Sequence, residues 1–345
     1  MLAGMLRRHG RPLERALSGV DAEQRHARRE QRRREIRRRR ALAIGGLLAV
    51  AAIAIVAVIA SSSGGSSHPP AGTSPSPGPA HTTAKAATNA ASAPSVGIAT
   101  TRSGPPGDAT VPILMYHVIA APPGGAPFPG LYVEPSLFAE QMRALKNAGW
   151  HAVTPDQVAS NWREGTPLPA GKPIVISFDN GYQSQYTQAL PILSRLGWVA
   201  EENIQLSGLP PSQGGLLQRQ IRGLVQAGWE LDTQGFSHAD LVTLDAEALH
   251  YQVAVARQTI QRRFHVPVNW FCYPSGHYDA AVIAEVKAAG YAGSTTVVPG
   301  WASPSSDPYR LPRLRVLGGT SPQSLLSEIE AIRGDPAPPA SYTGG

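Results

Sequence analysis

The stretch Ser177-Phe178-Asp179-Asn180-Gly181 places an acidic residue where a strand ends and a glycine lets the backbone turn. The apolar residues 174–176 before it are typical of a short buried strand, and residues 182–196 after it can form a helix. Side chains at the carboxyl ends of strands face the ligand in α/β barrels and wound sheets, which makes Asp179 a site candidate by position. The alternative interpretation is an aspartate that only caps the following helix.

The same alternation of strand and helix extends over the rest of the chain beyond Asp108. Predicted strands cover residues 111–116, 151–153, 174–178, 203–206, 230–233, 270–273, 291–295 and 314–316. Predicted helices cover residues 135–148, 155–162, 182–196, 216–227, 246–264, 280–289 and 322–332. Three of these helices end in Ala-Gly followed by an aromatic residue, which is a helix stop followed by a buried strand start. This order predicts an α/β fold with parallel strands that can close into a barrel.

Charge is distributed unevenly along the chain. Residues 1–40 hold 14 arginines against five acidic residues, a net charge of +9, so the remainder must sum to −2 to give the total of +7. An uninterrupted apolar segment follows at residues 41–60, and it is long enough to cross a bilayer as a helix. The arginines then predict a cytoplasmic amino terminus and an extracytoplasmic remainder. A cleaved signal peptide with a small-residue site at Ala60-Ser61-Ser62 is the alternative.

Composition divides the chain into five parts. An Arg-rich cytoplasmic tail (1–40) and a transmembrane helix (41–60) precede a Ser/Pro/Ala-rich segment (61–108), which lacks the large apolar residues that a core requires and is expected to be a disordered linker. A globular domain (109–333) and a flexible tail (334–345) follow. The sole cysteine, Cys272, excludes an internal disulfide and any zinc site of paired cysteines.

Five signatures in register resemble the polysaccharide deacetylase family, the NodB-homology domain of carbohydrate esterase family 4. They are Pro112-Ile113-Leu114-Met115-Tyr116-His117, Ser177 to Gly181, Gly235 to Leu241, Phe271 to Asp279 and Asp307 to Val316. The resemblance covers residues 111–332 and implies a distorted barrel of parallel strands with helices outside. It also implies metal-dependent removal of N- or O-acetyl groups from polysaccharide or peptidoglycan glycan.

The resemblance assigns the site residue by residue. Asp179 matches the general base, Asn180 stands where the family has an aspartate ligand, and Gln234 and His238 stand at the two histidine ligands. The expected cofactor is a divalent ion, Zn, Co or Ni. Two amides and one imidazole neither neutralise such an ion nor lower the pKa of a bound water as a carboxylate and two imidazoles do, so binding should be weak or lost.

Other positions of the family pattern are also altered. Cys272 occupies the slot of an arginine that orients the base, and Ser275 replaces a tyrosine whose backbone N–H serves the oxyanion, a role independent of the side chain. His117, at the end of the first strand, is a candidate proton donor or sugar contact, and the alternative is a histidine merely hydrogen-bonded in place. A turn followed by a helix start is the simpler interpretation of His277 and Asp279.

Two functions follow from these residues. One is a membrane-anchored deacetylase at the cell surface that hydrolyses acetyl groups of a wall polymer or exopolysaccharide. The other is a catalytically lapsed pseudoenzyme that binds the same glycan or scaffolds wall enzymes. Nucleic-acid binding by the Arg-rich tail is not expected if that tail lies beneath a membrane.

Overall fold

The computed structural model describes residues 105–207, 209 and 214–344. The predicted cytoplasmic tail, the predicted transmembrane helix and nearly all of the predicted linker lie outside these residues. Within the described residues, the helices are too short or too polar to cross a bilayer.

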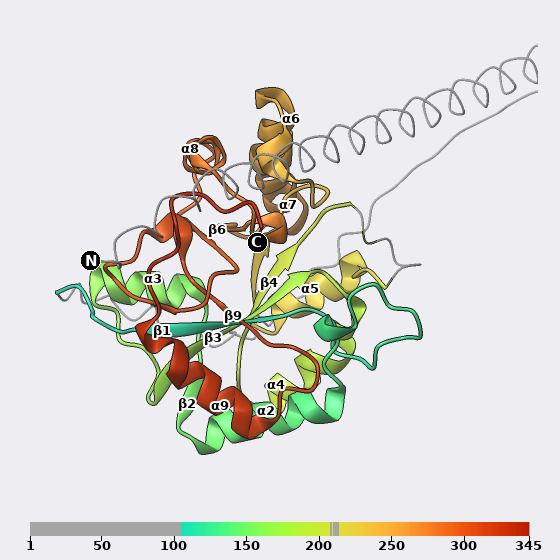
Figure 1. The fold of residues 1–345 in the computed structure, drawn as a ribbon, viewed down its shortest axis with the longest axis vertical. Coiled ribbons are helices and arrows are strands. Elements are labelled where there is room, and N and C mark those ends of the chain that lie inside the picture. Colours follow the sequence, from blue (N-terminus) through green and yellow to red (C-terminus); the bar gives the residue numbers. More distant parts are fainter. Residues whose placement is uncertain (1–104, 208, 210–213, 345) are drawn as a thin grey trace, which may run out of the picture. The chain divides into compact units, whose positions relative to one another are not determined.

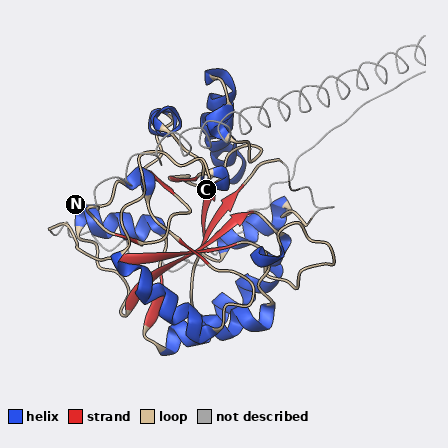
Figure 2. Ribbon diagram, in the orientation of Figure 1, coloured by secondary structure: helices blue, strands red, loops and turns tan. Residues whose placement is uncertain are grey.

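A curled sheet of nine strands forms the centre of the described domain, with helices around its outside (Figure 2). The strand order is β7-β6-β5-β4-β3-β1-β8, while β2 pairs with β3 and β9 with β1. All pairs are parallel except β1 with β8. The strands are β1 (Val111–Tyr116), β2 (Trp150–Ala152), β3 (Lys172–Asn180), β4 (Glu201–Ile204), β5 (Glu230–Thr233), β6 (Trp270–Cys272), β7 (Gly293–Thr295), β8 (Trp301–Ala302) and β9 (Leu314–Arg315).

One short segment joins the two sides of the curled sheet. Leu311 donates its N–H to Ser294 and accepts from Thr296, beside β7. Three residues later, Leu314 pairs with Leu114 of β1. The predicted barrel of parallel strands is therefore present as a curled sheet, and the segment 311–315 closes it as a seam.

The helices lie around the outside of the sheet, with α2, α4 and α9 grouped along one side (Figure 1). They are α2 (Pro135–Asn147), α3 (Pro155–Glu164), α4 (Leu190–Leu196), α5 (Gln218–Gln226), α6 (Ala246–His250), α7 (Ala256–Phe264), α8 (Ala280–Ala288) and α9 (Pro322–Ala331). Apolar side chains from α2, α4 and α9 pack on the outward faces of β1 and β3, including Phe138, Leu193 and Leu325. Burial of this surface is the main contribution to the stability of such a layered fold.

Two predicted helices are interrupted by a wider turn. Residues 246–264 form α6, a π-helical turn η5 (Tyr251–Val255) and α7, and residues 182–196 contain the π-helical turn η2 (Gln185–Ala189) before α4. A π turn accommodates one extra residue, and the apolar spacing alone does not reveal it.

The Ala-Gly-aromatic signature is confirmed at all three helix ends. Gly149, Gly228 and Gly290 have φ between 84° and 86°, a left-handed conformation that glycine adopts without a steric penalty. The aromatic residues that follow, Trp150, Trp229 and Tyr291, are buried. These glycines therefore fix where each helix ends and how the chain re-enters the sheet.

Residues 334–344, assigned from sequence to a flexible tail, lie against the domain. Tyr342 exchanges two backbone hydrogen bonds with Tyr278, at 2.8 and 2.9 Å. The hydroxyl of Tyr278 also donates to the Pro339 carbonyl at 2.8 Å. This segment therefore packs beside the turn that follows β6.

Candidate active site

Asp179 lies next to the end of β3, at the carboxyl edge of the sheet, and its side chain is 1% exposed. The strand is longer than predicted, because it includes Asp179 and Asn180. Ser177 and Asp179 are two residues apart and share the face that points into the curl of the sheet. Asp179 is therefore a strand residue whose side chain lies in the interior. This excludes the alternative of an aspartate that only caps the following helix.

A buried arginine from the seam holds this carboxylate. Arg313 donates from Nη1 to Oδ1 at 2.8 Å and from Nη2 to Oδ2 at 2.9 Å, and its side chain is fully buried. Such a bidentate pair fixes the carboxylate in one orientation. Burial alone would raise the pKa of Asp179, but the charge and hydrogen bonds of Arg313 outweigh it and keep that pKa below its usual value. The carboxylate is therefore ionised at neutral pH.

The other contacts of Arg313 explain why position 272 is a cysteine. The guanidinium donates to the Thr296 carbonyl at 2.8 Å, to the hydroxyl of Ser177 at 3.2 Å and to Sγ of Cys272 at 3.2 Å. The Cys272 thiol in turn donates to Oδ2 of Asp179 at 3.4 Å. The slot that the family pattern fills with an arginine thus holds a small side chain, and an arginine from the seam, just before β9, occupies the space beside it. Cys272 is therefore more than a small buried side chain, since its thiol contacts both partners of the ion pair.

His117 is buried beside the same carboxylate. Burial, helped by the nearby charges of Arg313 and Arg315, lowers its pKa to about 4, although Asp179 acts in the opposite direction. The ring is therefore neutral at physiological pH, and its Nδ1 has no hydrogen-bond partner among the described residues. A neutral imidazole is a poor proton donor. The protonation state of His117 therefore suits a contact with the sugar better than the role of proton donor.

Gln185 was missed by sequence reasoning and connects two of these strand ends. Its Nε2 donates at 2.9 Å both to the carbonyl of His117 and to the carbonyl of Asp179. The residue lies in the π-helical turn η2, which turns this side chain inward to 0% exposure. Apolar periodicity carries no signal for such a buried amide.

The three positions that the family pattern gives to metal ligands surround this edge of the sheet. Asn180 ends β3 with φ 79°, Gln234 follows β5, and His238 has φ 53°. Gln234 is 3% exposed and its Oε1 has no partner among the described residues. Burial lowers the pKa of His238 while the charge of Asp179 raises it, so these two side chains lie near each other.

This donor set does not fit the divalent ion that the family pattern implies. It offers two neutral amides and one imidazole, and the nearby carboxylate of Asp179 is already bound by Arg313. The described residues contain no group of three or more His, Cys, Asp or Glu side chains placed to hold an ion. Neutral oxygen donors leave the charge of a divalent cation uncompensated.

The remaining predicted residues lie at the rim. Ser275, with φ 56°, is exposed in the turn after β6. His277 contacts Asp240, with Nδ1 and Oδ1 3.1 Å apart. Asp279 caps α8 by accepting from the N–H of Val282 at 2.9 Å, which confirms the helix start.

Acidic side chains fill the interior below Asp179. Glu201 and Glu230 are cross-strand neighbours on β4 and β5, and Asn203 and Asp232 are the next inward pair. Burial raises the pKa of Glu201 to about 8 and that of Glu230 to about 7, each reinforced by an adjacent carboxyl. Sequence reasoning began this strand at Asn203 and missed Glu201, because acidic residues are rarely fully buried.

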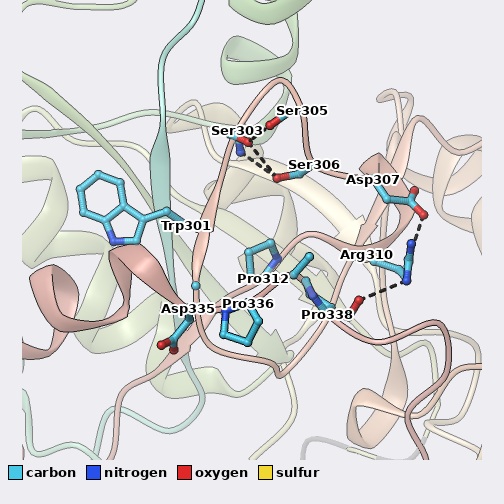
Figure 3. A pocket seen from close by; sticks show the side chains of 12 residues that line it. Trp301, Ser303, Ser305, Ser306, Asp307, Arg310, Pro312, Asp335, Pro336 and Pro338 are labelled. Atoms are coloured by element: carbon cyan, nitrogen blue, oxygen red, sulfur yellow. Dashed lines mark hydrogen bonds and ion pairs between the residues drawn. The ribbon is translucent and has the colours of Figure 1, made fainter.

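The described domain has a cavity near this arrangement and a larger one away from it. One of about 90 Å³ lies beside Gly181, between the ends of β3 and β4, and is lined by Ile204, Leu206 and Leu216 among others. Another of about 510 Å³ lies where β8 meets the start of β1, the opposite end of the sheet (Figure 3). Its charged side chains Asp307 and Arg310 are paired with each other at 2.8 Å. None of the predicted site residues lines it, so the chemistry is concentrated at the carboxyl edge.

Comparisons with known proteins agree with this geometry. A sequence profile described as polysaccharide deacetylase matches residues 168–294. A putative polysaccharide deacetylase of Bacillus subtilis strain 168 is 28% identical over 226 residues, which cover 65% of this chain and 78% of that protein. A poly-beta-1,6-N-acetyl-D-glucosamine N-deacetylase of Escherichia coli K12 is 41% identical over 68 residues, which cover 20% of this chain but only 10% of that enzyme.

The fold also matches solved structures. The deacetylase PplD of Streptococcus pyogenes, solved in complex with acetate, superposes with a TM-score of 0.59 at 26% identity. The match covers 64% of this chain and 99% of that one. A putative polysaccharide deacetylase of Bacillus anthracis gives a TM-score of 0.57 at 26% identity, over 64% of this chain and 69% of that one.

Proposed function

Because this domain belongs to the polysaccharide deacetylase family, we propose that the protein hydrolyses acetyl groups of an acetylated polysaccharide at the outer face of a cell membrane. Asp179 is the general base in this proposal. His117 and the backbone of Ser275 contact the substrate, and residues 41–60 anchor the chain.

The observation that carries the proposal is the Arg313–Asp179 pair. A fully buried carboxylate is costly to keep ionised, and a domain that only binds a neutral sugar polymer does not require one. Here the seam supplies a bidentate arginine even though position 272 lacks it. The apparatus around the base is therefore complete, in contrast to the altered ligand positions.

The proposed chemistry uses only the residues of this chain. Asp179, already ionised, accepts a proton from the water that attacks the acetyl carbonyl. The N–H of Ser275 donates to the oxygen that becomes negative in that step. When the tetrahedral adduct collapses, the bond between the acetyl carbon and the sugar nitrogen breaks, and the proton held by Asp179 passes to that nitrogen, which leaves acetate and a free amine. The ring of His117, neutral and beside Asp179, contacts the sugar or its acetyl group. No step is assigned to a metal, because the donor set does not fit one.

The substrate class is inferred from the family and from the relatives named above. An amino-sugar polymer with N-acetyl groups, in an exopolysaccharide or in peptidoglycan, suits the neutral hydrogen-bonding groups His117 and Gln234. The location is inferred from sequence, since the Arg-rich residues 1–40 and the apolar residues 41–60 favour a cytoplasmic amino terminus. Protease treatment of intact cells should digest the domain and spare the amino-terminal tail.

Acetate release tests the activity. The full-length chain in mild detergent is incubated with an acetylated glucosamine tetramer. Parallel samples contain either EDTA or added Zn²⁺, Co²⁺ or Ni²⁺. We expect release that Asp179→Asn abolishes, while Asp279→Asn, which changes an aspartate at the helix cap of α8, retains it. No release under any of these conditions would refute the hydrolase.

A second function is favoured by one specific observation, the replacement of charged metal ligands by the amides Asn180 and Gln234. With these groups the same mouth binds acetylated glycan without turnover. Sugar binding that is unaffected by EDTA, in a protein that releases no acetate, would support this function over hydrolysis.

A further inference from the structure

Two aromatic side chains in contact with each other lie beside the site and have no role in the proposed chemistry. The ring centroids of Phe236 and Tyr251 are 4.5 Å apart, with the planes inclined by 37°. Tyr251 is 45% exposed, whereas most large apolar side chains of the described domain are buried. The pair therefore presents an aromatic surface to solvent.

Its position is set by the loop that follows β5. Phe236 stands between Gln234 and His238, the two residues that border the mouth on this side. A Cβ built on Gly235 would lie 3.4 Å from the carbonyl oxygen of Gln252 and 3.8 Å from Pro274. Gly235, the neighbour of Phe236, therefore lies between the π-helical turn that carries Tyr251 and the turn that carries Ser275.

Hydrogen bonds hold this surface in place. The carbonyl of Phe236 accepts from the N–H of Ser207 at 2.7 Å and from its hydroxyl at 3.1 Å. The side chain of Gln252, next to Tyr251 in the π-helical turn η5, accepts from the N–H of Ser237 at 2.9 Å and donates to its hydroxyl at 2.8 Å. Both ends of the pair are therefore ordered before a ligand binds, which lowers the entropic cost of binding. Wider helical turns of this kind frequently occur at functional sites.

We propose that Phe236 and Tyr251 form a subsite for a pyranose ring of the polysaccharide, next to the sugar whose acetyl group faces Asp179. The C–H groups on one face of a pyranose are weakly positive and apolar, and they complement the negative face of an aromatic ring. The hydroxyl of Ser207, which donates to the Phe236 carbonyl, and the hydroxyl of Ser237, which accepts from Gln252, each keep one further hydrogen-bonding position for a sugar hydroxyl. The inference rests on the proposed function only in that the mouth takes a polysaccharide, and it does not require hydrolysis.

Binding of sugars of two lengths tests the subsite. Isothermal titration compares N-acetylglucosamine with its β-1,4- and β-1,6-linked tetramers on the full-length chain and on Tyr251→Ala, Tyr251→Phe and His250→Gln. We expect Tyr251→Ala to weaken the binding of at least one tetramer about tenfold and to leave the monomer unchanged. Tyr251→Phe keeps the ring and should bind as the wild type does. His250→Gln, which changes an exposed neighbour, is the matched control.

The subsite is refuted if Tyr251→Ala binds both tetramers as the wild type does, if it weakens monomer and tetramer equally, or if the wild type binds none of these sugars. Acetate measured on the same samples separates this failure from that of the hydrolase. Tyr251-dependent binding without acetate release leaves the subsite standing and refutes turnover. Equal acetate release from a tetramer by the wild type and by Tyr251→Ala refutes the subsite and retains the enzyme.

Discussion

Replacing Arg313 by methionine should destabilise the domain and inactivate the site at once. The substitution leaves the Asp179 carboxylate buried, at 1% exposure, without its two charge-assisted hydrogen bonds. Loss of one partner of a buried ion pair costs about 3–5 kcal/mol of unfolding free energy. Asp179→Asn, which leaves the guanidinium unpaired, should cost a similar amount.

The double variant Arg313→Met/Asp179→Asn distinguishes the cost of an uncompensated buried charge from simple loss of packing. When both partners are neutral, no uncompensated charge remains, so the cost should be smaller than the sum of the two single costs by at least about 2 kcal/mol. The dependence on pH has a definite sign. In Arg313→Met the guanidinium no longer opposes burial, which is the largest influence on Asp179 and outweighs the smaller effects of His117 and Cys272. The folded pKa of Asp179 is then raised, so the penalty is present above the unfolded pKa and shrinks as the pH falls toward about 4.

Urea unfolding followed by tryptophan fluorescence gives the unfolding free energy of the wild type, of the two single variants and of the double variant. The six tryptophans of the chain lie between residues 150 and 301, so the signal reports on this domain even in the full-length protein. The reasoning is refuted if Arg313→Met costs less than about 1 kcal/mol, or if the two single effects simply add. Acetate release from Arg313→Met should fall together with the loss of orientation of the carboxylate.

Three further predictions concern the surrounding residues. Glu201→Gln should stabilise the domain by about 3 kcal/mol at pH 7, because the pKa of Glu201 is about 8 when folded and about 4.5 when unfolded. The wild type should therefore lose stability as the pH rises from 5 to 8. Urea unfolding across this range tests it, and the same dependence of stability on pH in the variant and in the wild type would contradict this. Asn180→Asp combined with Gln234→His should raise Zn²⁺ affinity by at least tenfold, and calorimetry without any change would show that these positions are not the ligand sites. Gln185→Leu should cost about 1–3 kcal/mol, since it removes two buried hydrogen bonds to the carbonyls of His117 and Asp179, and a thermal midpoint equal to that of the wild type would exclude this.

Much of the fold is encoded locally and could therefore be predicted. The strands β1 and β5 begin and end where apolar patterning places them, and the glycines at 149, 228 and 290 stop their helices through a left-handed conformation. The two-residue strand β8 was not predicted, because so short an element has no periodicity to detect. The π-helical turns η2 and η5 were missed for a related reason, since one extra residue in a turn barely alters an amphipathic pattern.

The candidate site was predictable only where its residues lie within one motif. Asp179, Asn180 and Gly181 form a contiguous corner, so their place at the edge of the sheet follows from the strand before them. Arg313 belongs to the site through pairing of the seam with β1 and β7, and composition does not disclose which of the arginines is buried. A signal existed in its flanks, Leu311-Pro312 and Leu314, because an arginine enclosed by apolar residues in a strand is a candidate for burial with a partner.

The lowered pKa of His117 could not be predicted from the sequence either. It arises from burial and from the arginines at 313 and 315, which are distant in the chain. Sequence alone left open whether this histidine donates a proton, and burial now disfavours that role. The acidic interior around Glu201 could not be predicted either, since only the register of β4 with β5 brings its carboxyl beside that of Glu230.

The seam also determines when the site comes into existence during biosynthesis. Asp179 and Arg313 are separated by 134 residues, so a nascent chain carries the carboxylate long before its cation has been made. A truncated or prematurely released product would contain the whole acidic motif and yet lack a held base. A chain that lacks its carboxyl-terminal third would therefore lack the ion pair that orients Asp179.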